Sequence, residues 1–170
     1  MTKLEKLYEL AKKENIIIKY TELQSMGLLG LNVNKEGLPS IIFLDYSIKN
    51  DYYTHLEVFS EELGHYFTTS GKFVSVDTYK NKLLNAKCEN KALKWACEFL
   101  VSEDEIIDLV NKNLFIEDIY EELEVSKYIL DKRLEYLALK KQTIYLGNNK
   151  YLVLTNLPNI YIHTKFEYNI

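Results

Sequence analysis

The stretch SEELGHYF, residues 60–67, holds two carboxylates and an imidazole at a spacing that can bind a metal ion. On a helix each residue advances by about 100°, so Glu61 and His65 lie on one face, one turn apart. Glu62 lies beside them, offset enough to address a water at the metal without being a ligand itself. These residue types at this spacing predict a metal site with a general base.

The spacing corresponds to the helical zinc motif H-E-x-x-H of peptidases, with Glu61 in place of the first histidine. In that motif the two histidines bind the metal, and the glutamate takes a proton from the attacking water and delivers it to the leaving amine. The pattern E-E-x-x-H is weak by itself, because glutamate is common on helices and a helical histidine is usually only a partly exposed polar residue. A metal site therefore needs a second, independent indication.

A second predicted helix offers that indication. In CENKALKWACEFLV, residues 88–101, Glu89 heads a helical stripe that continues with Ala92 and Ala96. A buried Glu89 would need a strong partner, either a cationic side chain or a metal ion. The alanines would let this helix pack tightly against the first one, where Gly64 leaves room for neighbouring backbone. Glu89 could then become the third ligand beside the pair on the first helix.

Taken in order along the chain, these segments resemble the ImmA/IrrE metallopeptidases, small zincin-like proteins often encoded on phages and integrative elements. The resemblance rests on LYELAKKENIIIKY, SEELGHYFTTSG, CENKALKWACEFLVSEDEI and IYEELEVSKYILDKRLEYL, which together span residues 7–137. In that family the active-site helix usually reads H-E-L-G-H. The resemblance implies that His65 matches the second histidine, Glu62 the general base and Glu89, followed by Ala92, the downstream glutamate ligand.

Glu61 is the departure from the family pattern, and the resemblance implies that it replaces the first histidine as a metal ligand. A Glu, His, Glu set would neutralise Zn²⁺, whereas a His, His, Glu set leaves the ion positively charged. The water at the metal should therefore be less acidic, and the metal should be held more weakly. Zn²⁺ is the expected cofactor, and the oxygen-rich ligand set also suits Mn²⁺ or Fe²⁺.

The resemblance implies a metal-dependent endopeptidase that cleaves a helix-turn-helix repressor of a phage or mobile element. Two alternatives stay open. One is a non-catalytic anti-repressor that binds and sequesters a regulator without hydrolysis. The other is a helix-turn-helix DNA-binding regulator, because residues 119–137 have that pattern, with Lys127, Lys132 and Arg133 on the second helix. Acidic residues surround these cations and would repel phosphate, so a scaffold or protein-recognition role is favoured over nucleic acid.

Around these motifs the periodicity of apolar residues predicts an α+β fold with a small N-terminal sheet. A zincin-like helical core follows, made of the SEELGHYF helix and the glutamate helix, and then a helical bundle. The pattern predicts helices at 3–14, 51–68, 78–101, 103–112, 116–124 and 126–140, and strands at 16–20, 28–33 and 40–46. Alternating apolar residues on either side of GNN predict a C-terminal β-hairpin.

The length of 170 residues and the small number of Gly and Pro residues, six and two, favour one compact domain without long linkers. We expect a metallopeptidase domain over residues 1–140 and a β-rich appendage over residues 141–170, packed on the same domain. The formal charge of −4 argues against a phosphate-binding surface spread over the molecule. Neither a bilayer-spanning apolar run nor a signal-peptide core is evident, so we expect a cytoplasmic protein without a membrane partner.

The remaining histidines and the cysteines are given less specific roles. His55 is rotated away from His65 and is expected at the surface or in a supporting position, and His163 is expected to be a strand side chain. Cys88 and Cys97 are too far apart on one helix to form a disulfide, so free thiols are expected. The core-facing side of the SEELGHYF helix is expected to carry Leu56, Phe59, Leu63, Tyr66 and Phe67.

Overall fold

The computed structural model describes residues 1–69, 79–114 and 116–165, and their mixed α+β fold confirms the predicted class. The chain divides into two compact units, residues 1–96 and 97–170, with the boundary inside a long helix. Among the described helices, none combines the length and the apolar character that a bilayer crossing requires. The division into a domain over residues 1–140 and an appendage over residues 141–170 packed on the same domain stays a prediction.

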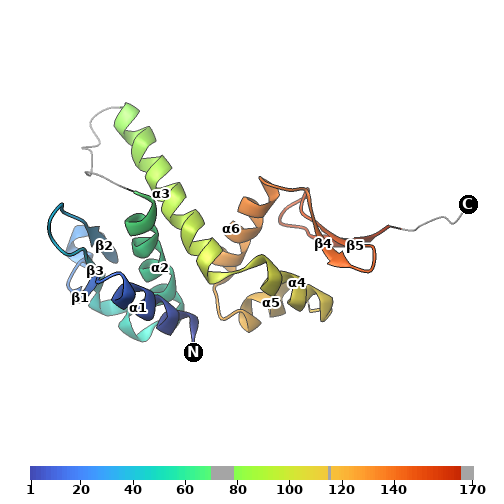
Figure 1. Cartoon of the computed structure of the whole chain (residues 1–170), viewed down its shortest axis with the longest axis horizontal. Coiled ribbons are helices and arrows are strands. Elements are labelled where there is room, and N and C mark those ends of the chain that lie inside the picture. Colours follow the sequence, from blue (N-terminus) through green and yellow to red (C-terminus); the bar gives the residue numbers. More distant parts are fainter. Residues whose placement is uncertain (70–78, 115, 166–170) are drawn as a thin grey trace, which may run out of the picture. The chain divides into compact units, whose positions relative to one another are not determined.

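The first unit contains a three-stranded sheet and the helices that pack on it (Figure 1). Its elements are α1 (Lys3–Lys13), β1 (Ile17–Thr21), the 3-10 helix η1 (Gln24–Met26), β2 (Gly30–Val33), β3 (Ile41–Asp45), the 3-10 helix η2 (Tyr46–Asn50), α2 (Tyr52–Thr68) and α3 (Tyr79–Leu100), which continues past the unit boundary. Helix α1 begins where the Thr2 side chain and Glu5 cap each other's main-chain N–H groups. The predicted elements are therefore present close to their expected bounds.

The sheet has the strand order β1-β3-β2. Strand β1 runs parallel to β3, whereas β2 runs antiparallel to it, so β2 is an edge strand. Ile42 and Leu44 on β3 are fully buried on the face that α1 and α2 cover. Burial of this apolar face fixes the register, because a slip by one residue would turn both side chains to the other face.

A buried carboxylate closes the end of β3. Asp45 accepts hydrogen bonds from the main-chain N–H groups of Leu23 (2.6 Å), Gln24 (3.1 Å) and Ser47 (2.9 Å). Hydrogen bonds from the Ser47 hydroxyl and from these N–H groups lower the pKa of Asp45 to about 2. Asp45 thus joins η1 to the start of η2, which follow the neighbouring ends of the parallel strands β1 and β3, and fixes the chain that enters α2.

Helices α2 and α3 pack closely at Gly64, as the sequence predicted. A Cβ atom at Gly64 would lie 2.8 Å from the carbonyl carbon of Ala92, which leaves room for a hydrogen atom only. Leu56, Phe59 and Leu63 are fully buried, which confirms that part of the predicted core face. Phe67 differs, because 38% of it is exposed and its ring stacks on Trp95 at a centroid distance of 4.9 Å.

His55 is buried, so the first of the two expected positions, the surface, is wrong, and a supporting role stays a prediction. Only 4% of the residue is exposed, and its Nε2 lies 3.0 Å from the hydroxyl oxygens of both Tyr8 and Tyr20. Burial lowers the pKa of His55, and burial together with the neighbouring Tyr20 raises the pKa of Tyr8. His55 therefore links α2 to α1 and β1 inside the first unit.

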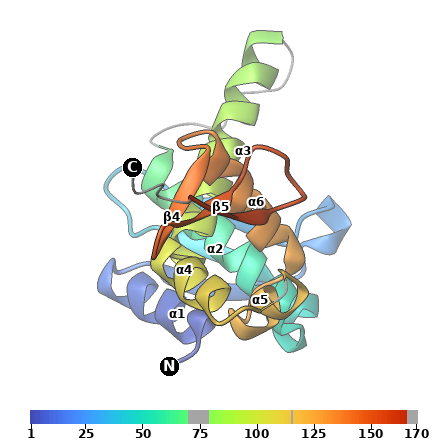
Figure 2. The same ribbon diagram turned by 90° about the vertical axis from the view of Figure 1, so that its right-hand side faces the viewer.

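The second unit contains short helices followed by antiparallel strands, which are visible in orange and red in Figure 2. Its elements are α4 (Glu103–Asn111), α5 (Ile116–Glu122), α6 (Lys127–Ala138), β4 (Thr143–Gly147), β5 (Lys150–Val153) and β6 (Tyr161–Thr164). Gly147, Asn148 and Asn149 all have positive φ angles, which confirms the turn predicted at GNN. Strand β6 adds a third strand to the predicted hairpin, and His163 lies on it. The cysteines are free, as expected.

Candidate metal centre

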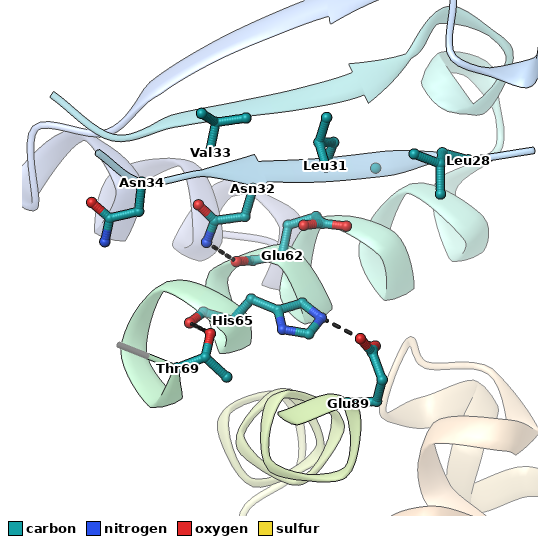
Figure 3. Close-up of a pocket in the computed structure, with 10 residues that line it drawn as sticks. Leu28, Leu31, Asn32, Val33, Asn34, Glu62, His65, Thr69 and Glu89 are labelled. Atoms are coloured by element: carbon teal, nitrogen blue, oxygen red, sulfur yellow. Dashed lines mark hydrogen bonds and ion pairs between the residues drawn. The ribbon is translucent and has the colours of Figure 1, made fainter. Parts of the chain in front are cut away.

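The structure brings Glu61, His65 and Glu89 together. Each residue offers one ligand atom, and these atoms all lie within 4.8 Å of one another. Glu61 and His65 come from one face of α2, and Glu89 comes from α3. Figure 3 shows His65 and Glu89 directed toward each other, with 3.2 Å between His65 Nε2 and Glu89 Oε2. Glu61 and His65, nominated by their spacing, and Glu89, nominated from the second helix, therefore form one cluster.

The close packing of the two helices produces this cluster. Gly64 immediately precedes His65, and Ala92 lies one helical turn after Glu89. The contact between Gly64 and the main chain of Ala92 therefore places Glu89 opposite the last turns of α2. The helix ends just beyond the site, where the Thr69 hydroxyl donates to the His65 carbonyl oxygen at 2.5 Å.

Glu89 is more exposed than the sequence suggested. The exposed fraction of its side chain is 55%, against 17% for His65. Its charge is therefore mostly solvated, and the predicted cost of burial does not arise. Glu89 contacts His65, and its exposure leaves the cluster open to an ion from solvent.

Glu62 is the most strongly perturbed group of the site. Burial raises the pKa of Glu62 to about 8, with further increases from the charges of Glu61 and Glu89, while a hydrogen bond from the main-chain N–H of Asn32 opposes the shift. Burial and the neighbouring Glu89 also raise the pKa of Glu61, although His65 opposes this. The carboxylates of Glu61, Glu62 and Glu89 lie close together with little positive charge beside them. A divalent cation would offset the repulsion between them. The donor set and its spacing therefore fit such a cation.

The cluster borders a cavity of about 360 Å³, which is large enough for part of a peptide. The opposite wall of the cavity is the edge strand β2 with its flanking residues (Figure 3). Glu62, His65, Thr69 and Glu89 line the helical side. A bound molecule would therefore lie between the strand edge and the charged groups.

The register of β2 shows which of its main-chain groups face away from the sheet. Asp45 N–H donates to the Leu29 carbonyl oxygen at 2.8 Å, and Gly30 lies opposite Leu44. Hydrogen-bonded and non-bonded pairs alternate along an antiparallel ladder, so Gly30 and Asn32 direct their N–H and C=O groups away from β3. Both residues line the cavity. Strand β2 can therefore pair with an extended peptide there.

Gly30 and Asn32 contact Glu62 although their local sequence pattern assigns them no role. A Cβ atom at Gly30 would lie 2.6 Å from Glu62 Oε1, and the Asn32 side chain donates from Nδ2 to the Glu62 carbonyl oxygen at 3.0 Å. The available signal was a glycine inside the strand pattern LGLNV, because such a glycine often marks a close approach of other groups. Its partner on the helix could not be read from local pattern.

A family model of the IrrE N-terminal-like domain, Peptidase M78, matches residues 11–135. We found no significant match to the chain among curated proteins or among solved structures. The matched region includes both helices of the candidate metal centre and the sheet beside them. The chain therefore belongs to the ImmA/IrrE family of metallopeptidases.

Proposed function

We propose that this protein is a metal-dependent endopeptidase that hydrolyses a peptide bond in a protein substrate. The observation that carries the proposal is the arrangement of Glu61, His65 and Glu89, whose ligand atoms lie within 4.8 Å of one another beside Glu62. The membership of the chain in a metallopeptidase family supports the same reaction class.

Each residue of the centre has a distinct part in this reaction. Glu61, His65 and Glu89 would hold the cation, with Zn²⁺ as the expected ion and Mn²⁺ or Fe²⁺ as alternatives. A bound cation would supply Lewis acidity to the scissile carbonyl group and to the attacking water. Glu62 would accept a proton as the water oxygen adds to the carbonyl carbon, and would return it to the amine nitrogen as the C–N bond breaks.

The edge strand supports a substrate in extended conformation. The outward N–H and C=O groups of Gly30 and the C=O group of Asn32 can pair with a peptide laid along β2. A peptide held there would run past Glu62 and His65, which line the same cavity. This arrangement suits cleavage within a chain rather than binding of a compact small molecule.

We propose a helix-turn-helix repressor of a phage or mobile element as the substrate, which the family resemblance supports. The test is to incubate the zinc-loaded protein with the repressor encoded beside its gene. Two discrete fragments are expected with the wild-type protein and none with Glu62→Gln. A repressor that stays intact with fully metal-loaded wild-type protein would count against proteolysis.

A second candidate function is sequestration of the repressor without cleavage. The observation that favours it is the contact of His65 Nε2 with Glu89 Oε2 at 3.2 Å, which gives these two side chains a partner within the protein. Glu62→Gln separates the two functions, because it removes hydrolysis and leaves the binding surface intact. Derepression in cells that survives this substitution would establish sequestration.

The described side chains of the helix-turn-helix segment give little support to DNA binding. Lys127 pairs with Asp131 at 2.5 Å and Lys132 pairs with Glu135 at 2.7 Å. Arg133 is only 7% exposed and donates to the Val101 carbonyl oxygen at 2.7 Å. The three cations that the DNA alternative requires are thus engaged within the second unit, which favours a protein as the partner.

A further inference from the structure

Asn32 makes two contacts to Glu62 from the opposite wall of the cavity. Its side-chain Nδ2 donates to the main-chain carbonyl oxygen of Glu62 at 3.0 Å, as Figure 3 shows. Its main-chain N–H hydrogen-bonds to the Glu62 carboxylate. One residue of β2 therefore holds both the backbone and the carboxylate of Glu62.

The side-chain amide of Asn32 has a local free-energy cost. Its Oδ1 is buried and has no hydrogen-bond partner in the described part of the chain. A buried acceptor without a partner is unfavourable, and an apolar side chain of similar volume would avoid the cost. Stability alone therefore does not explain an amide at this position. Its contact with Glu62 offers an explanation, because the amide orients that residue.

Gly30 also lies in close contact with the Glu62 carboxylate. A Cβ atom at Gly30 would lie 2.6 Å from Glu62 Oε1, so the carboxylate rests directly against the strand. Gly30 and Asn32 are also the residues whose main-chain groups face away from β3. The carboxylate is therefore fixed relative to the strand edge along which a peptide would lie.

We propose that Asn32 is a positioning residue that holds Glu62 in register with a peptide bound along the edge of β2. The proposal rests on the proposed peptidase function. Removing the amide leaves the main-chain groups of β2 in place, so substrate binding should change little. The main-chain N–H of Asn32 would still reach the carboxylate, but the Glu62 main chain would lose its hydrogen bond to β2, so Glu62 would shift relative to the strand edge. Misplacement of a reacting group by about 1 Å can lower the rate about 100-fold. The loss should therefore fall on kcat and leave KM nearly unchanged.

The test compares Asn32→Leu with Asn50→Leu in the zinc-loaded protein, with the neighbouring repressor as substrate. Asn50 is an exposed asparagine at the end of η2 and does not line the cavity, which makes it the control. We expect Asn32→Leu to keep or raise the Tm while kcat falls by about 10- to 100-fold and KM stays within about twofold. Asn50→Leu should leave both constants within about twofold. A full kcat in Asn32→Leu would overturn the proposal, as would an equal loss in the control.

A lower Tm in Asn32→Leu would raise the question of misfolding, and Asn32→Ala, which cannot overpack, answers it. A loss of kcat in Asn32→Ala at temperatures far below its Tm supports positioning, and a full kcat overturns it. A readout that does not need activity is hydrogen exchange of the side-chain amides in metal-free, ¹⁵N-labelled protein. We expect the Asn32 amide protons to exchange at least about tenfold more slowly than those of Asn34.

The two readouts separate failure of this proposal from failure of the proposed function. Wild-type protein that leaves the repressor intact, but protects the Asn32 amide, would refute peptidase activity and support the hold on Glu62. Equal exchange rates of the Asn32 and Asn34 side-chain amide protons would overturn the proposed contact between Asn32 and Glu62, whether or not the repressor is cleaved.

Discussion

Replacing Glu62 by glutamine should stabilise the metal-free protein, and increasingly so as the pH rises. The folded protein raises the pKa of Glu62 from the ordinary 4.5 to about 8, mainly through burial and the charge of Glu61. The folded state therefore binds this proton more tightly than the unfolded chain does. Stability supplied by the proton is complete below pH 4.5 and is lost as the pH rises toward 8. Glutamine mimics the protonated carboxyl group and keeps that stability.

The size of the effect follows from the two pKa values. Relative to a side chain that stays uncharged, Glu62 should lower the free energy of unfolding by about 3 kcal/mol at pH 7 and by about 1 kcal/mol at pH 5. For a chain of this length, 1 kcal/mol shifts the Tm by about 2–4 °C. The Tm advantage of Glu62→Gln should therefore grow by about 5–10 °C between pH 5 and pH 7.

The assay is thermal unfolding of chelator-treated wild-type protein, Glu62→Gln and Glu9→Gln over this pH range. Glu9→Gln is the control because Glu9 is an exposed residue on α1, and it should follow the wild-type protein at every pH. Zinc should reduce the advantage of Glu62→Gln, because a cation beside Glu62 favours its charged form. A Tm difference that does not change with pH would refute the described environment of Glu62.

Two further substitutions test the elements that position the site. Gly64→Ala should lower the Tm through an overpacking cost of about 1–3 kcal/mol, and should weaken zinc binding in a calorimetric titration because Glu89 moves away with α3; unchanged affinity would show that the contact with Ala92 does not set the site. Asp45→Asn should lower the Tm at pH 7. The wild-type protein should lose the contribution of Asp45 as the pH falls from about 4 toward 2, because its pKa is held at about 2. Acid unfolding followed by circular dichroism measures this loss, and identical acid profiles for the two proteins would contradict it.

Local pattern was sufficient to predict the α-helices and most of the strands, and to nominate Glu61, His65 and Glu89, which the structure brings together. Glu61 and His65 are four residues apart on one helix, so helical geometry alone places them together. Glu89 required a second inference, that small residues allow α2 and α3 to approach, and the contact between Gly64 and Ala92 confirms it.

Features that depend on pairing between distant segments could not be read from the sequence. The parallel pairing of β1 with β3 and the edge position of β2 have no local signal, because sheet order depends on tertiary packing. His55 illustrates the same limit, since its two tyrosine partners lie 47 and 35 residues away in the chain. The contacts of Asn32 with Glu62 belong to this class, because they depend on the packing of β2 beside α2.

The proposed peptidase function depends most directly on a metal ion held by Glu61, His65 and Glu89. The decisive measurement is the metal content, by mass spectrometry, of untagged protein purified without chelator, beside Glu61→Ala, His65→Ala and Glu89→Ala. We expect about one zinc or manganese ion per wild-type chain and a loss of metal in each variant. A wild-type protein that stays metal-free after reconstitution, or variants that retain the ion, would contradict the assignment of these three residues as ligands.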